Sequence, residues 1–192
     1  MPHCSRARIV VLLCLAGALT ALPVPAARAQ DVMDAKSAAF LRDKYLADLD
    51  TVHVKVMALA AAIPGDAYGW RPAAGVRSIS EVLMHFAAEW MYYVPMSVGG
   101  KPPADFGTPA ETMPRLAKIT AKREVMFELA TGWSHAWGQV VAADAATLTG
   151  RYAPWKVTLV EAAFGMSGDM HEHLGQLIAY ARSNGVKPPW SK

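Results

Sequence analysis

Four stretches of the chain show the hydrophobic spacing of amphipathic helices, with apolar residues returning every three or four positions. They cover residues 35–63, 78–98, 114–143 and 158–183, and connections rich in proline and glycine separate them. No stretch alternates apolar and polar residues over the length of a strand, and the sequence has no internal repeat. The pattern predicts an all-α, single-domain four-helix bundle.

Local residue choices mark the ends of these predicted helices. Residues 78–81 and 158–161 read Ser-x-x-Glu and Thr-x-x-Glu, the capping-box pattern in which both side chains bond free backbone N–H groups. Pro114 suits the first turn of the third helix, and Pro95 is expected to bend the end of the second. The Asn-Gly pair at 184–185, with two prolines soon after, is expected to end the fourth.

The predicted connections are each about a dozen residues or more, whereas about 2–8 residues are usual between the helices of a bundle. Such lengths permit a crossover topology and allow a connection to cover one end of the bundle. The connection at residues 68–78, YGWRPAAGVRS, stands out because it combines an aromatic pair with two arginines.

The N-terminus has the pattern of a secretory signal peptide. Arg6 and Arg8 precede a short apolar run, and residues 27–29 offer a small-x-small cleavage site. We therefore expect residues 1–29 to be removed and residues 30–192 to form a periplasmic or secreted domain; a retained N-terminal anchor is the alternative. No later segment has the roughly 18 apolar residues of a membrane span.

Removing this segment changes what the composition implies. Cys4 and Cys14 leave with it, so the mature chain has no disulfide, no thiol nucleophile and no thiolate ligand. Three of the 19 Lys and Arg residues leave as well, and the remainder balance the 16 Asp and Glu residues. Without a basic block the chain lacks the electrostatic signature of a nucleic-acid-binding protein, and we exclude that class.

The predicted fourth helix carries candidate metal ligands. Asp169 and His173 are four residues apart and so lie on one face, separated by about 40°, whereas His171 lies about 200° from Asp169. Spacing alone permits either the Asp169–His173 pair or His171 to face the core.

The predicted second helix offers a third candidate ligand. His85 has Glu81 four residues before it and Glu89 four residues after it. A histidine that binds a metal commonly donates its other ring N–H to a carboxylate, although the same spacing is common on exposed helices. Glu89 and Glu81 are also the candidate general bases of a catalytic site.

Two histidines and one carboxylate from two helices would make a three-ligand metal site with open positions, able to activate water or polarise a substrate. An ordinary i,i+4 Asp–His pair is the simpler alternative. We expect His53 and His135 to be structural or solvated. The sequence has no G-x-S-x-G motif and no C-x-x-C-H motif, while a b-type haem held by His and Met stays open.

Two blocks of the sequence resemble the DinB superfamily of bacterial four-helix proteins. They are RSISEVLMHFAAE at residues 77–89 and DMHEHLGQLIAYARSNGVKPPW at residues 169–190. In that family a histidine of the second helix and an H-x-x-x-H pair of the fourth bind a divalent metal. The resemblance implies His85, Asp169 and His173 as ligands, with Asp169 where the family usually has histidine, and leaves His171 as an outer or exposed residue.

Such a 2-His-1-carboxylate set suits Zn²⁺, Fe²⁺, Mn²⁺ or Ni²⁺. One hypothesis is therefore a metal-dependent hydrolase or transferase that acts on a small molecule, at a site covered by the connection around Trp70. The other is a non-catalytic periplasmic bundle that binds a metal or ligand in a stress response. The family includes enzymes that use small cellular thiols as cosubstrates. Export would take this chain away from the cytoplasm, where such thiols are kept reduced. A homodimer is a partner arrangement that the sequence leaves open.

Overall fold

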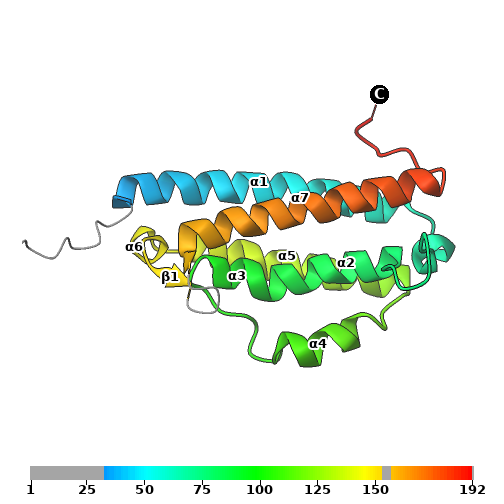
Figure 1. Cartoon of the computed structure of the whole chain (residues 1–192), viewed down its shortest axis with the longest axis horizontal. Helices are drawn as coiled ribbons and strands as arrows, with labels where there is room; N and C mark the ends of the chain where they lie inside the picture. The colour runs from blue at the N-terminus through cyan, green and yellow to red at the C-terminus, as the bar shows by residue number, and fades with distance from the viewer. Residues whose placement is uncertain (1–32, 153–156, 192) are drawn as a thin grey trace, which may run out of the picture. The chain divides into compact units, whose positions relative to one another are not determined.

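The computed structural model describes residues 33–152 and 157–191, so the expected signal peptide lies outside the described residues. Within them, four long helical stretches pack into a bundle (Figure 1), and the predicted all-α fold is confirmed. These stretches are α1 (Ala35–Ala62), α2 (Ile79–Ala88) with its continuations η2 (Glu89–Tyr93) and α3 (Val94–Ser97), α5 (Lys122–Ala142) and α7 (Leu159–Ser183).

The connections hold short elements of their own. They are η1 (Gly65–Gly69), α4 (Pro109–Leu116), α6 (Ala145–Leu148) and a hairpin of β1 (Arg151–Tyr152) with β2 (Val157–Thr158). The two strands are antiparallel, with Arg151 opposite Thr158. The hydrophobic pattern did not predict this hairpin, because two residues are too few for an alternation to show.

The order of the helices around the bundle explains the long first connection. Both α1 and α2 pack against α5 and α7, which places α1 and α2 at opposite corners. The chain must therefore cross the end of the bundle between them, and η1 with the residues up to Ser78 spans that distance. The crossover that the connection lengths permitted is present here.

The predicted caps of α2 and α7 are confirmed. Ser78 accepts a hydrogen bond from the backbone N–H of Glu81 at 3.2 Å, and the Glu81 carboxylate accepts one from the Ser78 N–H at 2.6 Å. Thr158 and Glu161 repeat the arrangement at 3.1 and 2.7 Å. At its other end α7 stops at Ser183, and Gly185 follows with a φ of +73°, a conformation open to glycine.

The predicted third helix is wrong at its start. Pro114 lies inside α4, which begins at Pro109 and packs on the outside of α2 (Figure 1), while the bundle helix α5 begins only at Lys122. A third capping box sets the start of α4. In it, the Glu111 carboxylate accepts a hydrogen bond from the Thr108 N–H at 2.9 Å.

The second helix widens into a π-helical turn where it reaches its proline. The N–H of Val94 bonds the carbonyl of Glu89, five residues back. Pro95 has no N–H, and its ring would clash with the carbonyl four residues before it in a regular α-helix. Turns of this kind are frequent at functional sites, and this one begins at Glu89.

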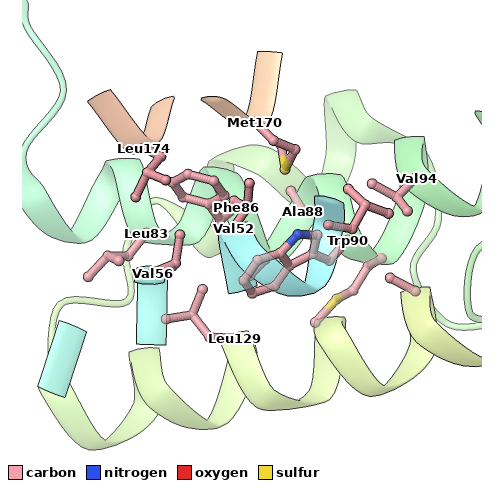
Figure 2. Close-up of a cluster of buried hydrophobic side chains, with 14 of the residues drawn as sticks. Val52, Val56, Leu83, Phe86, Ala88, Trp90, Val94, Leu129, Met170 and Leu174 are labelled. Carbon is pink, nitrogen blue, oxygen red and sulfur yellow. The ribbon is translucent and has the colours of Figure 1, made fainter. Parts of the chain in front are cut away.

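Apolar side chains from all four bundle helices form a continuous core (Figure 2). Residues on its inner faces include Val52, Val56, Leu83, Phe86, Trp90, Leu129, Met170 and Leu174. None of the helices in the described residues is both long and apolar enough to cross a bilayer.

Candidate metal centre

Four side chains from α2, η2 and α7 converge at one place in the bundle. His85 and Glu89 are one turn apart, and so are Asp169 and His173 on the facing helix. One nitrogen or carboxylate oxygen of each residue lies within 4.8 Å of those of the other three. Metal ligands of this type sit about 2.0–2.2 Å from Zn²⁺, so atoms on opposite sides of an ion are up to about 4.4 Å apart. Small side-chain movements would bring this cluster to that spacing.

The two histidine rings meet edge to face at the centre of the cluster. Their centroids are 4.5 Å apart and their planes are inclined at 88°. His85 Nε2 lies 3.1 Å from Glu89 Oε1, and His173 Nε2 lies 3.7 Å from Asp169 Oδ1. Each histidine therefore has a carboxylate of its own helix beside it, as the i,i+4 spacing required.

The cluster is buried on one side and open on the other. The Glu89 side chain is only 2% exposed, whereas that of Asp169 is 42% exposed. Buried carboxylates are rare unless they are paired or bind a metal. The cluster thus has a deep carboxylate at Glu89 and a route to solvent past Asp169.

Burial sets the protonation of the inner residues. It raises the pKa of Glu89 well above its usual value, and the negative charge of Asp169 acts in the same direction. Burial, helped by the positive charge of Arg77 and by His173, lowers the pKa of His85 to about 4. At neutral pH His85 is consequently an uncharged imidazole, the form that binds metals.

The residues present fit a divalent cation. Glu89 Oε2 is buried and has no hydrogen-bond partner in the described part of the chain, a state that costs about 1–3 kcal/mol for a polar group. Two carboxyl groups this close cannot readily both ionise without a cation between them. With two imidazoles beside them, the donor set suits Zn²⁺, Ni²⁺, Fe²⁺ or Mn²⁺.

A chain of hydrogen bonds along α7 holds His173. Its Nδ1 lies 3.2 Å from Gln176 Oε1, and Gln176 Nε2 donates to the hydroxyl of Tyr180 at 2.9 Å. Tyr180 in turn meets the ring of Trp70 edge to face, with centroids 5.3 Å apart. Since Gln176 Oε1 only accepts, the proton of His173 is held on Nδ1 and the lone pair of Nε2 faces the cluster.

Comparison with models of known protein families identifies the family of the chain. The model of the DinB superfamily matches residues 48–177, more than half of the sequence and a range that includes all four residues of the cluster. The chain belongs to the DinB superfamily. Comparisons with curated proteins and with solved structures returned no match.

In this DinB protein the structure brings together the three residues expected as ligands, His85, Asp169 and His173, and adds Glu89 to them. From the sequence, Glu89 was considered as a carboxylate partner of His85 or as a candidate base, and not as a metal ligand. Glu89 lies four residues after His85 and Glu81 lies four residues before it. Sequence spacing alone therefore could not show which of the two glutamates faces the cluster.

Glu81 is occupied elsewhere. Its carboxylate caps α2 and lies 3.2 Å from a guanidinium nitrogen of Arg71. The hydrogen bond from the Ser78 backbone, with Arg71 beside it, keeps the pKa of Glu81 below its usual value. An ionised carboxylate already committed to these partners is poorly suited to act as a base, which leaves Glu89 as the better placed of the two candidates.

The remaining histidines of the described residues lie away from the cluster. His171 Nε2 is 2.9 Å from Asp48 Oδ1 on α1, and the same aspartate accepts a hydrogen bond from the Ser167 hydroxyl. His53 stacks on Trp133 with centroids 4.2 Å apart, and His135 Nε2 lies 2.8 Å from the carbonyl of Lys101. These contacts join helices or connections and bring no second group of ligands together.

Proposed function

We propose that this DinB-superfamily protein binds one divalent transition metal through His85, Asp169 and His173 and uses it in hydrolysis or group transfer on a small molecule. The observation that carries the proposal is the convergence of these residues with the buried carboxyl group of Glu89. When bound, the metal would polarise a substrate or lower the pKa of a water.

The chain's own residues have separable roles in this proposal. His85 is kept uncharged by burial, and His173 is oriented by Gln176, so each offers a nitrogen lone pair. Asp169 supplies an oxygen on the open side. Glu89, which lies beside His85 and Asp169 in the cluster, would serve as the general base.

Metal titrations of single variants test the ligand assignment. We expect zinc or nickel to bind the parent, and His173→Ala to weaken binding by more than about 100-fold, because losses outside the ligand set typically cost about 10–100-fold. His171→Ala is the matched control and should bind like the parent, since His171 contacts Asp48 instead. Asp169→His should keep or tighten binding, because imidazole suits these metals.

Calorimetry on protein purified without a histidine tag gives these affinities, and metal analysis of the same protein identifies the ion. Equal losses for His171→Ala and His173→Ala, or no metal uptake by the parent, would rule the assignment out.

A non-catalytic metal-binding role is the second candidate, and the position of Glu89 favours it in one respect. A fourth protein ligand would close a tetrahedral site, as in structural zinc centres. Glu89→Gln separates the two roles, because loss of a ligand weakens metal binding, whereas loss of a base leaves binding intact and removes activity.

We further propose that the mature domain starts near Gln30 in the periplasm or outside the cell. The Arg6 and Arg8 start and the small-x-small pattern at 27–29 support this. Intact-mass analysis of protein from its native host should show a species that lacks residues 1–29. Export would be contradicted if every molecule found still contained Cys4.

A further inference from the structure

A cavity of about 290 Å³ opens beside His85, on the side of α2 that faces α4. Its volume is close to the lower end of the roughly 300–1,000 Å³ of small-molecule sites. The connection before α2 forms one wall with Arg71 and Arg77. Met84, Met113 and Leu116 of α2 and α4 supply apolar lining, and Glu81 and His85 of α2 line the cavity as well.

The connection that forms the cationic wall is held by its own hydrogen bonds. The Ile79 N–H donates to the Trp70 carbonyl at 3.0 Å, and the Arg71 guanidinium donates to the Val76 carbonyl at 2.8 Å. Gly75 has a φ of +80°, a left-handed conformation that lets the chain turn back toward α2. The wall is therefore a built part of the fold that holds Arg77 in the lining of the cavity.

The two arginines of this wall differ in what they are free to bind. Arg71 is committed to Val76 and to Glu81, whose negative charge it offsets at 3.2 Å. Arg77 makes no hydrogen bond or ion pair among the described residues, although its positive charge acts on His85, Glu89 and Asp169. A guanidinium without an ion pair among the described residues thus lines a cavity whose lining also contains apolar side chains and His85.

We propose that this cavity binds a small organic acid, with its carboxylate on Arg77 and its apolar body against Met84, Met113 and Leu116. A guanidinium presents parallel N–H donors that match a carboxylate. The inference rests on the proposed function, since it names the substrate class for the metal centre at His85. The bound acid would reach that centre from the side of His85.

Benzoate and benzamide test the proposal, because they are matched in size and differ in charge. We titrate each into the zinc-loaded protein and into the metal-free protein and follow binding by NMR. Arg77→Gln should weaken benzoate binding about tenfold or more, the usual scale for a hydrogen bond to a charged group, and leave benzamide unchanged. Arg77→Lys should fall between, because lysine keeps the charge but not the fork of donors.

Arg123→Gln is the matched control, since Arg123 lies on the exposed first turn of α5, outside the cavity. It should bind benzoate within about twofold of the parent. The anion site is overturned if the parent binds no benzoate, if it binds benzamide as tightly, or if Arg77→Gln and Arg123→Gln behave alike.

The two proposals fail separately. Benzoate binding that depends on Arg77 in a protein that takes up no metal supports the anion site and counts against the metal centre. Metal uptake, together with benzoate binding that is the same in the parent and in Arg77→Gln, supports the metal centre and contradicts the anion site.

Discussion

His173 has its orientation set by a neighbour on its own helix. Gln176 is three residues on and lies beside it, and its amide oxygen faces Nδ1 at 3.2 Å. This contact decides which ring nitrogen of His173 carries the proton and hence which one is free to bind. The residue that fixes this detail is neither charged nor a ligand, so a search for metal-binding residues would pass over it.

Replacing Gln176 with Leu should weaken metal binding about 10–100-fold, because it removes the acceptor that holds the His173 tautomer. Gln176→Glu keeps an acceptor at that position and should bind within a few-fold of the parent. Calorimetric titration with zinc measures both.

Gln139→Leu provides the control for this change. Gln139 also accepts a hydrogen bond, from the Lys101 backbone N–H at 2.9 Å, but on α5 and away from the cluster. Its loss should leave zinc affinity unchanged, and a Gln176→Leu variant that binds zinc like the parent would show that His173 needs no such support.

Among the elements, α5 and the second helix approach each other closely near the site. A Cβ added to Gly132 of α5 would lie 2.9 Å from the carbonyl oxygen of Ala87 and 3.4 Å from Trp90 Cβ. Glycine here allows two helices to approach closely just where the second helix widens into η2. The position of Glu89 thus depends on a contact made by its neighbours in the sequence.

Gly132→Ala should destabilise the protein by about 1–3 kcal/mol, the usual cost of overpacking, although alanine is the better helix former. Gly138→Ala on the same helix should be neutral or stabilising by up to about 1 kcal/mol, because a Cβ there meets nothing within 4 Å. Urea unfolding of both variants measures the difference, and the idea of a close approach fails if Gly132→Ala is as stable as Gly138→Ala.

For the whole molecule, the cluster joins two helices that are far apart in the sequence. His85 and Glu89 belong to the second helical stretch, and Asp169 and His173 to the last one. An ion held between them binds the folded chain and not the unfolded one, so it adds to the free energy of unfolding.

Zinc at about 100 times its dissociation constant should therefore add about 2.7 kcal/mol, which for a chain of this size raises Tm by about 5–10 °C. Thermal unfolding followed by circular dichroism, with zinc or with EDTA, measures the shift. It should vanish in His85→Ala and persist in His171→Ala. An equal shift in both variants would place the bound ion elsewhere.

Much of the fold could be predicted because its signals are local. The bounds of α1 and α7 and the caps at Ser78 and Thr158 follow from hydrophobic spacing and from side chains that bond free N–H groups within one turn. The start at Pro114 was wrong because a proline is tolerated inside α4, where the capping box at Thr108 had already begun the helix.

The sequence by itself determined which residues share a helix face. Helical geometry places Asp169 beside His173 and Glu89 beside His85 whatever surrounds them. Only the tertiary structure decided which of these faces are buried and what they meet, because helix spacing contains no information about neighbouring helices. Packing buried Glu89 while Glu81 stayed at the helix cap, and it brought His171 against Asp48 on α1. It also placed Arg77, without an ion pair among the described residues, in the lining of the cavity beside His85.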